Sequence, residues 1–334
     1  MKDFPARTGI TLEDVAKAAG VSRSQASRAL RNDPGVKDDT KAHILATAAG
    51  LNYTPNLAAQ TLASRQSRSI GLVVGDVLNP YEAMLARECD RTLRDAGYFA
   101  MLAVSGTTST IRAFIDQRIA GLVLIGAPAE RDEIVAVSKL LPTVYIGRDL
   151  KSEKVESISS DDALGARLAT EFLLKLGHRD IAHITGGPGA GAQRRADAYR
   201  KVMQEHGLKP IIVEGRYNVD AGSTATDALM ARKDRPTAIF AANDLIALGA
   251  ISRLAWHGFR VPDEVAVVGF DDIPMAASEP ISLTTVRQKV PEMVAAAVET
   301  LTTRLNDPTA SIRNIIVAPE LITRRSSGAE VGHP

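Results

Sequence analysis

The stretch Thr11-Leu-Glu-Asp-Val-Ala-Lys-Ala-Ala-Gly-Val-Ser-Arg-Ser-Gln-Ala-Ser-Arg28 decides the first part of the fold. A hydroxyl residue, Thr11, stands three positions before Asp14, which is the spacing of a helix-capping box. Gly20 then supplies the backbone freedom that a tight turn needs, and Ser22, three positions before Gln25, starts a second helix in the same way. The stretch therefore predicts two short helices joined by a tight turn.

The second of these helices has a polar side that suits DNA. Arginine bonds guanine bidentately, glutamine does the same to adenine, and serine reaches bases or phosphates. A second helix held by a tight turn against a first one is the unit that enters the major groove. A generic helical hairpin with a solvated face is the alternative interpretation. The expected DNA-contacting residues of this segment are Thr11, Ser22, Arg23, Ser24, Gln25, Ser27 and Arg28.

The rest of the N-terminal part predicts a third helix and a connecting segment. Asp38 or Asp39 begins the helix, which ends at Gly50. After Pro55, residues 57–63 predict a very short helix before a polar linker at 64–68. A helix of this length does not persist alone in water, so we expect it to order only against a partner. An ordinary interdomain linker is the alternative.

The charge of the chain is concentrated in this N-terminal part. Net charge is only +1, yet residues 1–68 hold ten Lys and Arg against six Asp and Glu. Such an asymmetry is typical of a nucleic-acid-binding head on a neutral body, and a solvated basic face is the alternative.

Beyond residue 70, short apolar runs alternate with amphipathic helices. Buried parallel strands with crossover helices produce this rhythm, so we expect an α/β fold with two similar sheets. Helices at 81–96 and 162–176 end at Gly97 and Gly177. The expected strands are 70–74, 100–104, 121–125, 144–147, 181–185, 211–213, 238–241 and 265–269.

Composition indicates a cytoplasmic protein. Hydrophobic residues make up 45% of the 334 residues, and no apolar run approaches the roughly 20 residues of a membrane span. The N-terminus lacks the apolar segment of a secretory signal, and the single cysteine, Cys89, has no partner for a disulfide or for zinc.

An enzyme is the competing class of function. Gly187 and Gly189, followed by Ala192, imitate the fingerprint of a dinucleotide-binding dehydrogenase. No well-placed acidic residue follows the motif, and the six histidines lack metal-ligand spacing. We therefore expect no enzyme, no cofactor and no metal.

The motifs together match a known family. The matching residues are Thr11-Leu12, Asp14-Val15-Ala16, Ala19-Gly20-Val21-Ser22, Ser27-Arg28, Tyr53, Pro55-Asn56, Ala59 and Leu62. On these residues, and in nearly the whole chain, the sequence resembles the lactose-repressor (LacI/GalR) family of bacterial transcription regulators. The resemblance implies a helix-turn-helix DNA-binding domain at 1–55, a hinge helix and linker at 56–69, and a two-lobed, periplasmic-binding-protein-like effector and dimerisation domain at 70–325. We expect a disordered tail at 326–334.

The resemblance also implies roles for residues of the hinge helix and of the effector domain. It implies that Leu62 of the hinge helix wedges between base pairs in the minor groove, with Asn56 and Ala59 beside it. In the body, ligands of such sheets bind beyond the carboxyl ends of the strands. The family's effector-binding residues map here to Tyr81, Arg148, Arg195, Tyr217, Asn243 and Asp271.

These side chains suit a sugar or a sugar acid, because amides, carboxylates and arginines bond hydroxyls and a tyrosine stacks on an apolar sugar face. The sequence departs from the family where the loop 186–191 lacks polar side chains, where Glu82 replaces a common aromatic residue, and where Ala198 replaces a glycine. The identity of the effector therefore stays open.

The function implied is that of a repressor of a catabolic operon. We expect a homodimer that binds palindromic operator DNA and is associated with the bacterial nucleoid. We also expect a small ligand to change its operator affinity allosterically. A corepressor-dependent regulator, a regulator controlled by a protein partner and a solute-binding protein are the alternatives. The family's lobes divide near Ser159; residues 288–305 then return to the first lobe, and residues 312–321 re-enter the second.

Overall fold

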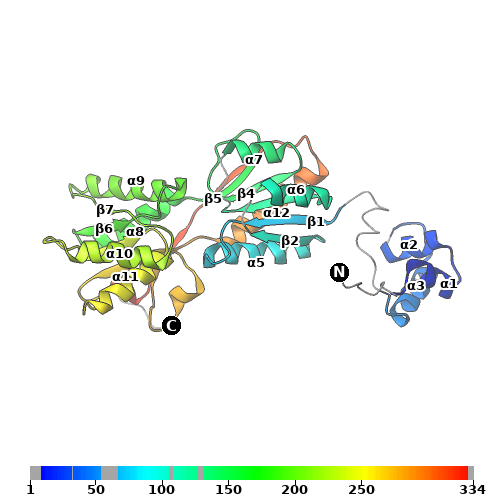
Figure 1. The fold of residues 1–334 in the computed structure, drawn as a ribbon, viewed down its shortest axis with the longest axis horizontal. Helices are drawn as coiled ribbons and strands as arrows, with labels where there is room; N and C mark the ends of the chain where they lie inside the picture. The colour runs from blue at the N-terminus through cyan, green and yellow to red at the C-terminus, as the bar shows by residue number, and fades with distance from the viewer. Residues whose placement is uncertain (1–8, 32, 54–66, 105–107, 127–130, 330–334) are drawn as a thin grey trace, which may run out of the picture. The chain divides into compact units, whose positions relative to one another are not determined.

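The computed structural model describes residues 9–31, 33–53, 67–104, 108–126 and 131–329. The chain divides into two compact units, Met1–Ser67 and Arg68–Pro334, each with its own core. Figure 1 shows the three helices of the first unit and the two sheets of the second.

The first unit is built from α1 (Leu12–Ala18), α2 (Arg23–Arg31) and α3 (Asp38–Gly50). Both predicted capping boxes are present. The amide of Asp14 donates to Thr11 Oγ1 at 3.3 Å, and the amide of Gln25 donates to Ser22 Oγ at 3.2 Å. Small apolar side chains of all three helices, including Val15, Ala26 and Ile44, are buried together. The predicted three-helix head is confirmed.

The hinge helix expected at residues 57–63 cannot be compared with the structure. Its residues, including Ala59 and Leu62, and the neighbouring Asn56 lie outside the described part of the chain.

The second unit contains a first sheet in the strand order β11-β5-β4-β3-β1-β2. All neighbouring strands of this sheet run parallel, with Ile70 beside both Ala100 and Gly121. Its strands are β1 (Ser69–Val74), β2 (Phe99–Val104), β3 (Gly121–Ile125), β4 (Thr143–Gly147), β5 (Glu156–Ser160) and β11 (Asn314–Val317).

The first sheet and the helices on its two faces form the first lobe, which has three layers. Side chains point alternately to the two faces along each strand. Leu72 and Val74 pack with α5 (Pro80–Asp95) and α12 (Val290–Asn306). Val73, on the opposite face, packs with side chains of α6 (Thr108–Asp116) and α7 (Arg131–Ser138). Both faces of the sheet are therefore covered, as the continuous apolar runs predicted.

The second sheet has the order β12-β10-β9-β8-β6-β7, and only the pairing of β10 with β12 is antiparallel among the described strands. Helices α8 and α9 share a core with one face, and α10 and α11 with the other (Figure 1). The elements of this second lobe are α8 (Asp162–Lys175), β6 (Ile181–Ile184), α9 (Ala190–Glu205), β7 (Ile211–Val213), α10 (Val219–Met230), β8 (Ala238–Ala241), α11 (Asp244–Trp256), β9 (Ala266–Asp271), η1 (Pro274–Ala277), β10 (Thr284–Arg287), β12 (Glu320–Ile322) and η2 (Arg325–Ser327).

Within residues 131–329 the chain passes between the lobes three times. The first passage follows β5 at Ser160, close to the expected Ser159, and α12 then returns to the first lobe as expected. The prediction for 312–321 is wrong in part, because β11 still pairs with β5 of the first sheet. Only β12, after Val317, reaches the second sheet.

The expected disorder from Ser326 onward is wrong at its start. Ser326 and Ser327 are buried in η2. Ser326 Oγ donates to the carbonyl of Val267 at 2.6 Å and accepts from the amide of Thr284 at 2.9 Å. These bonds tie the end of the described chain to the second sheet. Among the described helices, none is long and apolar enough to cross a membrane.

Candidate functional site

The polar side of α2 is presented as the sequence predicted. Ser22, Arg23, Ser24, Gln25 and Arg28 are exposed, as is Thr11, whereas Ser27 is half-buried. The side-chain oxygen of Gln25 accepts from the amide of Ser22 at 3.2 Å, so the cap uses its acceptor and leaves its amide N–H groups to donate. Arg23 lies 3.8 Å from Glu13, and both side chains are more than 70% exposed. An exposed pair of this kind holds the guanidinium only weakly.

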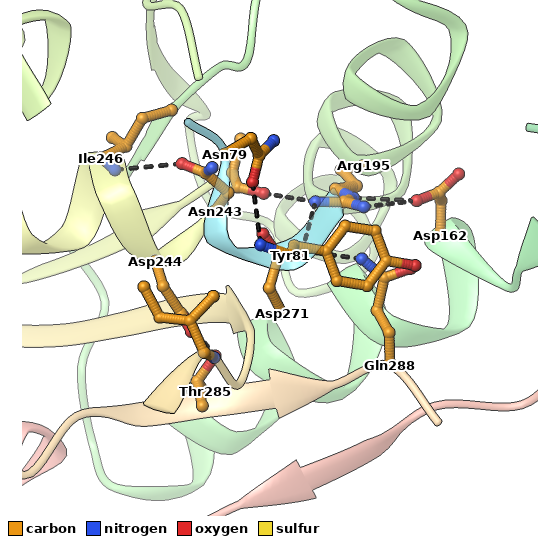
Figure 2. A network of polar contacts seen from close by, with 12 residues as sticks. Asn79, Tyr81, Asp162, Arg195, Asn243, Asp244, Ile246, Asp271, Thr285 and Gln288 are labelled. Atoms are coloured by element: carbon orange, nitrogen blue, oxygen red, sulfur yellow. Dashed lines mark hydrogen bonds and ion pairs between the residues drawn. The ribbon is translucent and has the colours of Figure 1, made fainter. Parts of the chain in front are cut away.

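Arg195 of α9 is the centre of the candidate ligand site in the second unit (Figure 2). Its Nε donates to Asp162 Oδ1 at 2.9 Å, and its Nη1 donates to the carbonyl of Ala242 at 2.5 Å. The guanidinium carbon lies 3.5 Å from the ring centre of Phe270. Burial lowers the pKa of Arg195, but the charges of Tyr217, Asp162 and Asp271 outweigh it, so the arginine stays charged.

Asp162 is held between two arginines. Arg194 donates from Nε and Nη2 to its Oδ2, opposite the bond from Arg195 to Oδ1. Gly191 leaves the room for this arrangement, because a Cβ there would lie 3.2 Å from Asp162 Oδ2. The glycine loop thus brings α9 close to a carboxylate.

A chain of hydrogen bonds joins the two lobes beside Arg195. Tyr81, at the start of α5 in the first lobe, donates from its hydroxyl to Gln288 Oε1 at 2.8 Å. Gln288 follows β10 and donates from Nε2 to Asp271 Oδ1 in the second lobe at 2.7 Å. Figure 2 shows Tyr81, Gln288 and Asp271 side by side. Gln288, which lies where the chain passes between the lobes, therefore bonds to one side chain of each lobe.

Asp271 ends β9 in an uncommon backbone conformation, with φ at +122°. Burial raises its pKa to about 7, although Arg195 and the bond from Gln288 act in the opposite direction. Its distance to Arg195 Nη1 is 3.9 Å. Burial thus has the largest effect on the pKa of this carboxyl.

Asn243 and Asp244 organise the start of α11. Asn243 Oδ1 accepts from the amide of Ile246 at 3.0 Å, and its side chain also bonds Asp271. Asp244 is fully buried; it accepts from Thr285 Oγ1 at 2.5 Å and from the amide of Ile273 at 2.8 Å. Asn243 therefore borders the site, while Asp244 has a role in packing the lobe.

The position of Tyr217 explains why the loop at 186–191 has a glycine at residue 186. Its ring centre lies 6.0 Å from the guanidinium carbon of Arg195. A Cβ at Gly186 would lie 2.2 Å from atoms of the ring, so a side chain there would displace the tyrosine. The loop lacks polar side chains at this point because Tyr217 occupies the space.

The structure brings together five of the six expected effector residues: Tyr81, Arg195, Tyr217, Asn243 and Asp271. The sixth, Arg148, follows β4 in the first lobe, with its guanidinium carbon 5.7 Å from the ring centre of Tyr145. Sequence reasoning missed Asp162 and Gln288, which follow β5 and β10. The rule that found the others would have found these two if those strands had been recognised.

The network borders open space. A cavity of about 460 Å³ is lined by Asp271 and Gln288 together with Met84 of α5 and the start of α12. Pockets for small molecules have volumes of this order. No group of acidic, histidine or cysteine side chains within the described residues could hold a metal ion.

Comparison with known proteins places both units. Residues 11–56 match the family described as "Bacterial regulatory proteins, lacI family", and residues 170–327 match "Periplasmic binding protein-like domain". The chain is 31% identical to the "Probable HTH-type transcriptional repressor ExuR" of Bacillus subtilis (strain 168) and 29% identical to the "Ribose operon repressor" of Haemophilus influenzae. Each comparison covers 95% of this chain and 98% of the relative.

Solved structures agree with this placement over both units. The lac repressor dimer bound to operator and the anti-inducer ONPF superposes with a TM-score of 0.83 at 26% identity, covering 96% of this chain and 99% of that chain. A complex of the transcriptional regulator CelR with cellobiose superposes with a TM-score of 0.71 at 28% identity, covering 95% of this chain and all of that chain.

Proposed function

The chain belongs to the LacI family of DNA-binding transcriptional repressors, and on that premise we propose that a small polyhydroxy ligand in the second unit changes its affinity for operator DNA. It is a regulator and not an enzyme, because its relatives are transcriptional repressors. As such it acts in the cytoplasm, where we propose that it associates with the nucleoid.

The observation that carries this proposal is the hydrogen-bonded chain from Tyr81 through Gln288 to Asp271, beside Arg195. It brings donors and acceptors from both lobes together beside the cavity that Asp271 and Gln288 line, and a ligand with many hydroxyl groups requires such donors and acceptors. Relatives named for ribose and for cellobiose support a sugar in particular. We assign hydroxyl binding to Arg195, Asn243 and Asp271, and stacking on the sugar to Tyr217.

The exposed face of α2 supports a proposal for the residues that contact DNA. We propose that Arg23, Ser24 and Gln25 read base edges and that Arg28 and Ser27 contact the backbone, with Asn56, Ala59 and Leu62 in the minor groove. We also keep the boundaries at 1–55 for the DNA-binding domain, 56–69 for the hinge and 70 onward for the effector domain.

A homodimer on a palindromic operator completes the proposal. One head reads one half-site, and a two-fold protein requires a two-fold operator. The edge strand β2 offers a surface for self-association, since Phe99, Leu102 and Val104 are each 46–59% exposed. The solved lac repressor complex with operator is likewise a dimer.

A thermal-shift screen of monosaccharides and disaccharides tests the ligand, followed by operator binding with each compound that stabilises the protein. We expect at least one sugar to raise the melting temperature and to change operator affinity. Compounds that raise the melting temperature without changing operator affinity would contradict the allosteric role. The direction of the change distinguishes an inducer from a corepressor.

A further inference from the structure

Glu82 occupies a confined position in the first lobe, between the start of α5 and the glycines that follow β1 and β3. It lies in the first turn of α5, and its side chain turns back so that Oε2 accepts from the amide of Asp76 at 2.9 Å. A Cβ at Gly126 would lie 2.4 Å from both the carboxyl carbon and Oε1 of Glu82. Gly126 follows β3 and Gly75 follows β1, so the carboxyl group sits at the carboxyl ends of two adjacent strands.

The charged groups that act most strongly on this carboxyl are themselves acids. Burial raises the pKa of Glu82 to about 7; hydrogen bonds from the amides of Asp76 and Gly75 lower it, while the charges of Asp76 and Asp271 raise it. Asp271 belongs to the second lobe, so acids of the two lobes lie within electrostatic reach of each other. On the β4 side, Tyr145 is within electrostatic reach of both Glu82 and Arg148.

The two arginines of α9 nearest to Asp162 and Asp271 are already paired with protein carboxylates. The charge of Arg195 is balanced by Asp162 and Asp271, and its Nη1 donates to a backbone carbonyl. Arg194 is bound to the other oxygen of Asp162. A ligand carboxylate at this wall would meet arginines already bound to protein carboxylates.

We propose that Glu82 sets the charge of the ligand: the cleft accepts sugars that present hydroxyl groups to Glu82 and rejects the corresponding sugar acids. A hydroxyl donates to the carboxylate, whereas a ligand carboxylate there is repelled by both Glu82 and Asp271. This inference rests on the proposed function and narrows its ligand from sugars and sugar acids to neutral sugars.

The test uses calorimetric titration of the full chain with three matched pairs: glucose and glucuronate, galactose and galacturonate, and mannose and mannuronate. The proteins are the wild type, Glu82→Gln and a control, Glu88→Gln. Glu88 lies on the same helix, where it bonds Arg91. We expect the wild type to bind at least one sugar about tenfold or more tightly than its acid. Glu82→Gln should narrow that ratio at least about fivefold, and Glu88→Gln should leave it unchanged.

The pH dependence of the ratio between sugar and acid affinity provides a second readout. A purely structural role of Glu82 would leave this dependence unchanged. As Glu82 loses its proton between pH 6 and pH 8, the wild type should discriminate more strongly against the acid. Burial raises the pKa of Asp271 as well, so the part of this dependence that disappears in Glu82→Gln belongs to Glu82. A ratio that stays constant with pH, or that is the same in a folded Glu82→Gln protein, overturns the inference.

The remaining outcomes separate the two proposals. If an acid binds as tightly as its neutral sugar or more tightly, the inference fails and the proposed function stands. If none of these compounds and no monosaccharide or disaccharide of the wider screen binds, the proposed function fails and the selectivity of Glu82 falls with it.

Discussion

At the scale of single residues, Asp271 and Asp272 stand at consecutive positive φ values of +122° and +58°. Such a conformation costs on the order of 1–3 kcal/mol per residue and persists only where contacts hold it. Here Asp272 accepts from Arg287 at 2.6 Å and from Arg324 at 2.7 Å, and these ion pairs fix the end of β9. Asp271 is thereby aimed at Gln288 and Arg195.

Replacing Arg195 should destabilise the fold as well as the site. Arg195→Ala leaves Asp162 and Asp271 buried with less positive charge, which costs about 3–5 kcal/mol for a buried pair. Arg195→Lys should recover part of this loss, because it keeps a cation. Urea unfolding of both variants measures the difference. An alanine variant as stable as the wild type would show that the arginine is not needed to balance the two acids.

Glu82 should make the stability of the wild type depend on pH. The pKa of Glu82 is about 7 in the folded protein against 4.5 for the free group, so the folded state holds a proton that the unfolded state releases. This contribution is fully present below pH 4.5 and is lost as the pH rises through 7. Relative to Glu82→Gln, the wild type should therefore lose about 2–3 kcal/mol of unfolding free energy between pH 5 and pH 8.

Urea unfolding at both pH values checks this, with Glu88→Gln as a control. The bond to Arg91 lowers the pKa of Glu88, so the control should show the opposite direction or no change. Parallel pH profiles for the wild type and Glu82→Gln would contradict the prediction.

At the scale of elements, the local pattern predicts the apolar strands and misses the polar ones. β5 reads Glu156-Ser-Ile-Ser-Ser160 and is entirely buried. It tolerates burial because Glu156 pairs with Arg304 at 2.7 Å and Ser157 donates to Asn314 at 2.7 Å. Both partners lie about 150 residues away in sequence, at separations of 148 and 157. A strand stabilised by such distant partners has no local signature, and Asp162 was missed with it.

The helix α2 supplies a prediction about base reading. Arg23→Ala should relax preference at one symmetric pair of operator positions, at a cost of about 1–3 kcal/mol per half-site. Its exposed pair with Glu13 contributes little, so the stability of the DNA-free protein should stay the same. Lys41→Ala should instead weaken all sequences alike. Competition binding against a set of operator variants distinguishes the two, and an equal loss on every sequence for Arg23→Ala would rule out its reading role.

At the scale of the whole molecule, coupling requires that a ligand act differently on two arrangements of the lobes. Gln288 lies on one of the passages between the lobes and bonds to Tyr81 on one side and Asp271 on the other. A ligand that binds Asp271 therefore also affects Gln288, the residue that joins the two lobes. The sequence could predict the ends of this chain, Tyr81 and Asp271, but not the glutamine between them.

The hinge residues give a prediction for the DNA end alone. By the family resemblance, Leu62→Ala should weaken operator binding, because it removes the apolar wedge between base pairs. Ligand affinity of the DNA-free protein should not change. Operator titration and calorimetry with a sugar from the screen measure the two quantities. A change in ligand affinity without DNA would contradict a role confined to the hinge.

The most direct test of the coupling between ligand and DNA is the operator affinity of the wild type and of Asp271→Asn, each measured with and without a sugar that stabilises the wild type. Asparagine keeps the size of the side chain and an oxygen for Gln288, while it removes the carboxylate. Adding the sugar should change the operator affinity of the wild type by about 5- to 150-fold. Asp271→Asn should bind the operator with unchanged affinity and should not respond to the sugar. A full response in that variant would place the ligand away from Asp271 and contradict the proposed coupling.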